Sequence, residues 1–265
     1  MNFSDYSRLE ALNHSGMKYL ERSPAHYKAW RDGTLDDKTT DAQSFGISAH
    51  VAILEPDRFE TDYLFLPDTS HCKTPAEKAA LTKASKKEFA GENKRLLSYA
   101  DNTAILSMRE AVMKHAYARY LIESSLKEKV NTWTDPDSGA ACKARFDLWR
   151  PESGILSNIK TIQDASNDAF ARHVRSYNMA RQAAFYTDGV QAESFLWIVI
   201  EHQEPYGVRV ITVPDYLLQI GRQSYQLLSH LYQRCIETDT WPSYSQEVTP
   251  LWLNSTTSVA ESASI

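Results

Sequence analysis

The sequence contains only three cysteines, and their scattered positions match neither a disulfide framework nor a zinc site. It has no run of about eighteen apolar residues, so we expect no membrane-spanning helix. Residues 1–5 lack a basic region followed by an apolar core, so we expect no secretory signal. These absences together predict a reduced, cytoplasmic protein.

An excess of positive charge is also missing. The chain has 29 Lys and Arg residues against 34 Asp and Glu residues, which gives a net charge of −5. The total argues against nucleic-acid binding, but the distribution of charge matters more than the sum. The stretch from Lys73 to Arg95 holds seven basic and three acidic residues. We expect a helix there whose basic side chains are either solvated or in contact with DNA phosphates.

The chain has enough apolar residues to form a full hydrophobic core. At 265 residues and 42% hydrophobic, it fits a single domain over 1–253, followed by a flexible tail at 254–265. We expect residues 1–125 to be mainly helical and 126–253 to form a sheet core with flanking helices. The helical part should have two short helices over 6–31, a helix over 42–55, a strand over 58–66 and a helix over 101–124.

The second part of the chain alternates strand and helix patterns. Strands are expected over 129–135, 193–202 and 207–213, a long helix over 168–189, and a last helix over 214–239. Residues 195–200 are nearly all apolar, as in a strand covered on both faces. The pattern therefore predicts an α/β fold with a central mixed sheet flanked by helices.

Two further apolar runs, residues 143–149 and 155–161, predict a hairpin because a Pro-Glu-Ser-Gly turn separates them. Alternate side chains of a strand point to opposite faces, so Asn158 and Lys160 share one face of the second run. Asp147 lies on the first run. An acid on one strand, with a position two before a lysine on the next, is the arrangement of a metal-dependent phosphodiester nuclease.

The hairpin and several other pieces resemble the exonuclease domain of the RecE type (exonuclease VIII), a phage and prophage recombination family in the PD-(D/E)xK nuclease superfamily. The pieces occur in the family order over about the first 190 residues: Tyr6, 23–30, 46–50, 133–139, 145–147, 159–161 and 182–186. The resemblance implies a restriction-endonuclease-like α/β fold with an N-terminal helical elaboration.

The resemblance also implies a metal site. His50 would be a ligand on its helix, although a lone histidine on an apolar helix face is more often part of the core. Asp147 would be the main anionic ligand, joined by the residue at position 158 and the backbone carbonyl of Ile159. The ion would be Mg²⁺ or Mn²⁺, and imidazole suits Mn²⁺ better.

The other catalytic residues follow from the same resemblance. Lys160 would orient the attacking water or stabilise developing charge. Gln182 and Tyr186 are four residues apart, so they share a helix face and would hold the DNA backbone or the metal ligands. The candidates for DNA contact, with solvated surface as the alternative, are Arg8, Ser15, Lys18, Arg145 and Arg175. Arg145 could instead form a salt bridge, and Arg172, Arg175 and Arg181 should give the long helix a basic surface.

One residue departs from the family, which has Asp where this chain has Asn158. An amide oxygen can coordinate a metal but carries no negative charge, so metal affinity and rate should both fall. Three explanations are open: an engineered Asp-to-Asn change that traps substrate, a naturally inactive DNA-binding relative, or a shifted site that uses Glu152 or Asp164.

The function expected from the resemblance is digestion of duplex DNA from an end. The 5′-terminated strand would be degraded, which leaves a 3′ single strand for a single-strand annealing recombinase. A ring-like homo-oligomer is also implied. The alternatives are a non-catalytic DNA-binding protein on the same fold and a RecB-like nuclease with an iron–sulfur cluster. The last is disfavoured because such a cluster needs four cysteines.

Overall fold

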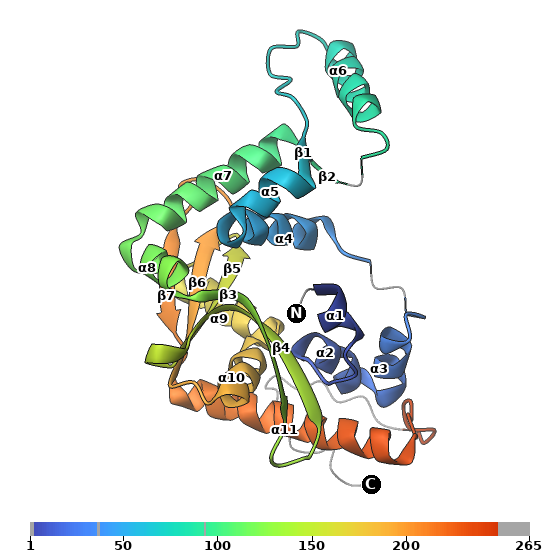
Figure 1. Cartoon of the computed structure of the whole chain (residues 1–265). Helices are drawn as coiled ribbons and strands as arrows, with labels where there is room; N and C mark the ends of the chain where they lie inside the picture. The colour runs from blue at the N-terminus through green and yellow to red at the C-terminus, as the bar shows by residue number, and fades with distance from the viewer. Residues whose placement is uncertain (1–2, 36–37, 93, 249–265) are drawn as a thin grey trace.

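The structure, a computed structural model, describes residues 3–35, 38–92 and 94–248 and is organised around one five-stranded sheet (Figure 1). The strands follow the chain order across the sheet: β3 (Leu126–Thr134), β4 (Ala141–Arg150), β5 (Ile155–Ile162), β6 (Ser194–Glu201) and β7 (Val208–Thr212). Only β5 and β6 pair in parallel, and the other neighbours are antiparallel. The predicted mixed sheet is confirmed. The predicted tail at 254–265 lies outside the described residues.

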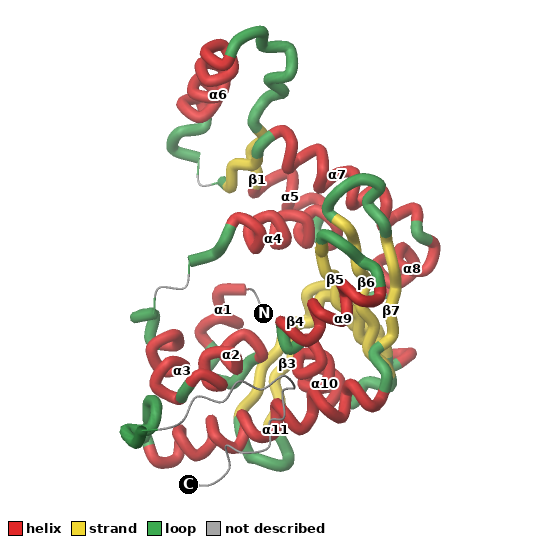
Figure 2. Tube along the Cα trace, turned by 180° about the vertical axis from the view of Figure 1, so that it is seen from behind, coloured by secondary structure: helices red, strands yellow, loops and turns green. Residues whose placement is uncertain are grey.

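Helices cover both faces of this sheet. Helices α10 (Met179–Val190) and α11 (Asp215–Thr238) lie on one face, and α4 (Asp41–Leu54), α7 (Tyr99–Lys114) and α8 (Ala116–Ser124) lie on the other (Figures 1 and 2). Strand β6 shows why. Phe195, Trp197 and Val199 belong to one buried cluster, while the alternating residues Leu196, Ile198 and Ile200 belong to the other. An all-apolar strand is stable because each face has its own helical layer.

Two of the three N-terminal helices pack against α11: α2 (His14–Arg22), which also contacts α10, and α3 (Pro24–Arg31). The first, α1 (Phe3–Arg8), lies beside the sheet. Asn13 caps α2 by accepting from the backbone N–H of Gly16, and Ser23 caps α3 with Pro24 at its first turn. The segment between α1 and α2 runs beside β4, where Leu12 bridges to Cys142. The side chain of Lys143 donates to the backbone oxygens of Tyr6 and Leu9, which ties α1 to the sheet.

Between β1 (Tyr63–Phe65) and β2 (Arg95–Leu97) the chain forms an arm that carries α6 (Pro75–Glu88) (Figure 1). The two short strands pair in parallel at the base of the arm. A capping box of Thr74 and Glu77 starts α6, but none of its residues is buried. The predicted helix in this lysine-rich stretch is confirmed.

The helical part differs from the prediction in three places. Residues 6–31 contain parts of three helices, and the expected helix over 101–124 is divided into α7 and α8, with His115 capping the second. Most of the strand expected over 58–66 is the helix α5 (Pro56–Asp62). Because short helices turn their apolar faces in different directions, one periodicity over the whole stretch does not describe them.

The long helix expected over 168–189 is also two helices, α9 (Asn167–Ser176) and α10. They are separated at Asn178, whose backbone is left-handed with a φ of 50°. Asparagine tolerates this conformation better than most residues, so it breaks a helix without glycine or proline. The break turns Arg181 inward, where it is 2% exposed, so the predicted exposure of this arginine is wrong.

Replacing Gly221 by Ala should destabilise the fold strongly. A Cβ atom at this position of α11 would lie 2.1 Å from the backbone oxygen of Ala180 on α10. Two backbones must then separate, so we expect a loss of about 3 kcal/mol in the free energy of unfolding. Urea denaturation measures it, with the exposed Gln223→Ala on the same helix as the control. Equal stability of the two variants would show that α10 and α11 are not packed this closely.

The described part of the chain contains no helix of the length and apolar character needed to cross a membrane.

Candidate active site

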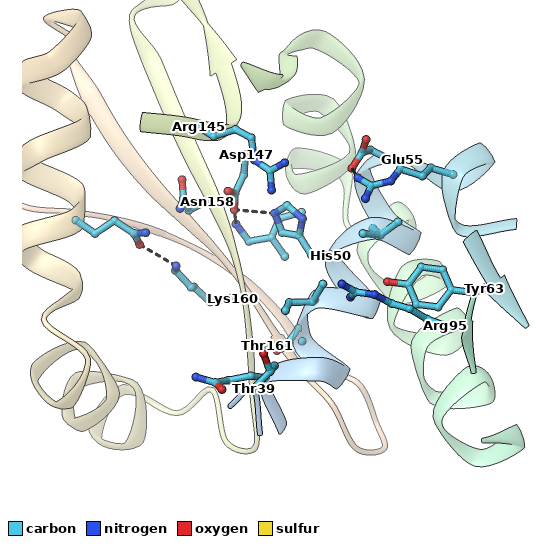
Figure 3. A pocket seen from close by; sticks show the side chains of 17 residues that line it. Thr39, His50, Glu55, Tyr63, Arg95, Arg145, Asp147, Asn158, Lys160 and Thr161 are labelled. Atoms are coloured by element: carbon cyan, nitrogen blue, oxygen red, sulfur yellow. Dashed lines mark hydrogen bonds and ion pairs between the residues drawn. The ribbon is translucent and has the colours of Figure 1, made fainter. Parts of the chain in front are cut away.

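The candidate site lies where β4 and β5 stop pairing. Their ladder covers only Leu148–Arg150 against Ile155–Ser157. Asp147 and Asn158 would be the next pair in this register, but the backbone N–H of Ile159 donates instead to Oδ2 of Asp147, at 2.9 Å. Beyond this point β4 pairs with β3 and, at Cys142, with Leu12, while β5 pairs with β6. A cavity of about 620 Å³ is lined by residues of β4, β5 and α4 (Figure 3).

Helix α4 brings His50 to this cavity. A Cβ on Gly46, one turn earlier, would lie 3.2 Å from Oγ1 of Thr161, so the glycine lets α4 lie close against β5. The same helix buries Val51, Ile53 and Leu54 in the core. Nε2 of His50 is 3.1 Å from Oδ2 of Asp147, and Figure 3 shows the two side chains facing each other. The helix and the hairpin therefore meet at these two residues.

A third potential ligand, Glu128, was not among the sequence predictions. It lies on β3 directly opposite Asp147, between two regular pairs of the β3–β4 ladder. Its backbone is left-handed with a φ of 53°, which is unusual for a residue other than glycine and marks a constrained position. Its Oε1 is 3.6 Å from Nδ1 of His50, and its Oε2 is 2.8 Å from Nε of Arg145. Donor atoms of His50, Glu128 and Asp147 all lie within 4.8 Å of one another.

The charges of this cluster shift each other's pKa values. Burial acts to lower the pKa of His50, but Asp147 and Glu128 outweigh it, so the pKa is raised. Burial acts to raise the pKa of Asp147, but His50 and Lys160 hold it below its ordinary value. The pKa of Glu128 is raised, mainly by burial. Burial also lowers the pKa of Lys160, and Asp147 only partly compensates. Shifts of this kind, in a cavity, are typical of functional sites.

Lys160 is held in place from the other side of the cavity. Its Nζ donates to Oε1 of Gln182 on α10 at 2.8 Å, and Nε2 of Gln182 lies 3.4 Å from the hydroxyl of Tyr186. Lys160 and Gln182 line the cavity, whereas Tyr186 is buried against the ring of Phe146. Tyr186 can therefore position Gln182, but it does not reach the cavity itself.

These donors fit a divalent metal ion. Glu128, Asp147 and Asn158 occupy neighbouring positions on three successive strands, and His50 approaches from α4. Oδ1 of Asn158 is buried and has no hydrogen-bond partner among the described residues. A buried oxygen without a partner is costly, and a bound cation would satisfy it. Two carboxylates, an imidazole and an amide oxygen are ligands that Mg²⁺ or Mn²⁺ accepts. The carboxylate grouped with Asp147 and His50 is that of Glu128, which lies beside the cavity rather than in its lining, whereas Glu152 and Asp164 belong to neither the group nor the lining.

The residues predicted to contact DNA are spread over the surface around the site. Arg145 lines the cavity, and Ser15 and Lys18 line a second cavity beside it. Arg8 and Arg175 are exposed and line neither cavity. Ile159, whose backbone carbonyl was expected to supply a ligand oxygen, is among the residues that line the first cavity.

Comparison with known proteins gives one family. Residues 13–251 match the model of the PDDEXK-like domain of unknown function (DUF3799). No curated protein is significantly similar in sequence.

Two solved structures match this chain, one of them with a TM-score above 0.5. The crystal structure of a candidate exonuclease from Eubacterium rectale superposes with a TM-score of 0.63 at 15% identity and covers 90% of this chain and 87% of its own. A phage-related exonuclease from Haemophilus somnus covers 73% of this chain and 95% of its own at 12% identity, with a TM-score of only 0.36. The first likeness shows the shared restriction-endonuclease-like fold.

Proposed function

Because the chain belongs to the PDDEXK-like family, we propose that it is a metal-dependent deoxyribonuclease that digests duplex DNA from an end. One observation carries the proposal: His50, Glu128 and Asp147 gather within 4.8 Å of one another, beside an open cavity that Lys160 lines. An acid pair and an imidazole beside a cavity that a half-buried lysine lines match the needs of phosphodiester hydrolysis, which are metal binding, water activation and charge neutralisation.

Each side chain has a role in this proposal. Asp147, Glu128, His50 and Asn158 would hold the metal ion. When bound, a divalent ion lowers the pKa of water and neutralises charge on the phosphate. Lys160 stabilises the charge that develops on the phosphate oxygens, and its hydrogen bond to Gln182 keeps Nζ aimed at the cavity.

Arg145 can bind both Glu128 and the DNA in this proposal. Its Nε faces Glu128 at 2.8 Å, and its side chain is 30% exposed at the cavity. A planar guanidinium can bind a carboxylate on one edge and a phosphate on another. In this proposal Arg145 fixes the Glu128 carboxylate and contacts the DNA backbone.

The finer parts of the proposal come from the resemblance to RecE-type exonucleases. The 5′-terminated strand is degraded, and the remaining 3′ single strand is passed to a single-strand annealing recombinase. The ion is Mg²⁺ or Mn²⁺, the protein acts in the cytoplasm, and it assembles as a homo-oligomer around DNA. The likeness of fold to a candidate exonuclease is consistent with digestion from an end.

A linear duplex and a covalently closed circle, each incubated with the protein and Mn²⁺, test the proposal. Mononucleotides should be released only from the linear DNA, because digestion starts at an end. Asp147→Asn should abolish release, since it removes the carboxylate that contacts His50 and Ile159. Equal cleavage of both DNAs would contradict an exonuclease, and release by Asp147→Asn would contradict this metal site.

A second function, DNA binding without hydrolysis, is favoured by Asn158 alone. Its uncharged oxygen sits where the resembling family has a carboxylate. Metal-independent binding of the duplex, together with no release of nucleotides in Mn²⁺ or Mg²⁺, would support this alternative.

A further inference from the structure

A second cavity lies beside the candidate active site, and its lining is strongly basic. It has a volume of about 370 Å³ and shares Lys160 and Gln182 with the first cavity. Its other lining residues come from α2, from the end of α9 and from the start of α10, and they include Lys18 and Arg181. None of the lining residues in the described chain has a carboxylate.

Arg181 is the most unusual residue of this cavity, because it is 2% exposed yet poorly partnered. Oε2 of Glu21 is 3.0 Å from its Nη1, but neither Nε nor Nη1 makes a well-formed hydrogen bond within the described residues. The buried Nε2 of His14, also in the lining, likewise has no partner there. A guanidinium has five N–H donors, and burying it with some of them unsatisfied is destabilising. An anion in the cavity would offset this cost.

The electrostatic field in the cavity also favours a bound anion. Burial and then the charges of Arg181, Lys160 and Lys18 lower the pKa of His14 to about 3. These three cations therefore act on the same small volume. Two carboxylates oppose them: Glu21, which faces Arg181 and also accepts from Asn178, and Asp147, which acts on Lys160. A net positive field favours an anion over a neutral ligand.

Backbone groups add to the field. The N-terminus of α10, a helix of twelve residues, reaches the cavity at Met179. Its N-cap residue, Asn178, makes no side-chain hydrogen bond to the free N–H groups of the first turn. Free N–H groups at a helix N-terminus bind phosphate oxygens well. Cations on several sides and a helix N-terminus together suit a tetrahedral oxyanion.

We propose that this cavity binds a phosphate group of the DNA strand whose neighbouring phosphodiester occupies the active site. The identity of the strand rests on the proposed function, whereas the anion site does not. The shared residues, Lys160 and Gln182, place the two sites next to each other, as adjacent phosphates of one strand require. The phosphate is either a terminal monoester or an internal diester. The site holds the strand in register for cleavage.

Inorganic phosphate is the first probe, used in metal-free buffer with EDTA. Titration calorimetry and thermal unfolding should show saturable binding to the full chain. Arg181→Gln should weaken it about tenfold or more, since it removes a charge-assisted hydrogen bond to the phosphate. Lys18→Gln, on an exposed residue that tolerates substitution, should also weaken it. Arg22→Gln removes the same charge from the same helix outside the cavity and should leave binding unchanged. No phosphate binding by the unmodified protein, or equal binding by Lys18→Gln and Arg22→Gln, would overturn the site.

Short duplexes in EDTA then identify the source of the phosphate. If it is a terminal monoester, a duplex with hydroxyl ends should bind more weakly than the phosphorylated one. If it is internal, a neutral methylphosphonate at one of the first linkages should weaken binding instead. Either loss of affinity should be smaller in Lys18→Gln, because the lysine that would contact the phosphate has already been removed. Losses that are the same size in Lys18→Gln, or no loss in either duplex, would refute the proposal. Phosphate binding without any hydrolysis of DNA would refute the nuclease and leave the anion site intact.

Discussion

Replacing Asn158 by Asp is expected to raise the rate of Mn²⁺-dependent DNA hydrolysis by about 10²- to 10³-fold. The substitution turns a buried, unpartnered amide oxygen into a charged ligand beside Asp147. Stabilising the transition state by about 3–4 kcal/mol through one more anionic ligand corresponds to this increase. Release of mononucleotides from a linear duplex measures it. Lys160→Ala in the same background should remove most of the gain, because the metal site alone does not neutralise the phosphate.

The same substitution should change stability in opposite directions with and without metal. Three carboxylates, from Glu128, Asp147 and Asp at position 158, would repel one another when no cation is bound. In EDTA the variant should therefore unfold at a lower temperature than the unmodified protein, and Mg²⁺ should reverse the order. A variant that binds Mg²⁺ tightly and still releases no nucleotides would make DNA binding without hydrolysis the better-supported function.

Replacing Glu128 by Gln should have the second-largest effect, a decrease of about 10²-fold in the rate of hydrolysis. With Asn at position 158, Glu128 is the second carboxylate near Asp147, and its loss leaves one anionic ligand. Binding of Mn²⁺ should weaken in parallel, and calorimetry measures it without any DNA. The matched control is Glu152→Gln, since Glu152 lies in the turn between β4 and β5 and pairs with Arg150 outside the cavity.

Two outcomes would assign Glu128 differently. Full activity of Glu128→Gln would show that this carboxylate only holds Arg145, with which it forms an ion pair. A large loss of activity with unchanged Mn²⁺ affinity would also show that Glu128 does not bind the metal. The loss would then come from Arg145, which Glu128 no longer holds in place. In the Asn158→Asp background the cost of Glu128→Gln should be smaller, because two carboxylates remain.

The hairpin with Asp147, Asn158 and Lys160 could be predicted from the sequence because it depends on local rules. Alternation fixes the faces of the strands, and the turn with Gly154 in a left-handed conformation fixes their register. Helices α4 and α11 were predictable for the same reason: Thr40 and Pro56 bound the first, and Pro214 precedes the second.

Glu128 escaped sequence analysis because its position depends on the pairing of β3 with β4. In sequence it stands between Lys127 and Lys129, as on a solvated strand edge. The signal that could have found it is the hairpin register itself, since the turn near residues 135–139 places it opposite Asp147. Its left-handed backbone could not be anticipated, because glutamate does not favour that conformation.

The break at Asn178 was missed for a related reason. One helix over 168–189 satisfies the local pattern, but the crossover from β5 to β6 must fold back over the sheet. The left-handed residue provides that turn. Sequence analysis therefore put Arg181 on an exposed face, whereas the structure puts it inside the second cavity.

The arm that carries α6 has a consequence for how the chain can vary. Because none of the residues of α6 is buried, the helix contributes no apolar burial to the stability of the protein. Insertions, deletions and domain fusions between Leu66 and Lys94 should therefore leave the fold intact, whereas changes at Tyr63 and Arg95 reach the cavity. Evolution, or an engineer who attaches a fluorophore, can rework the length and charge of this segment without disturbing the chemistry at its base.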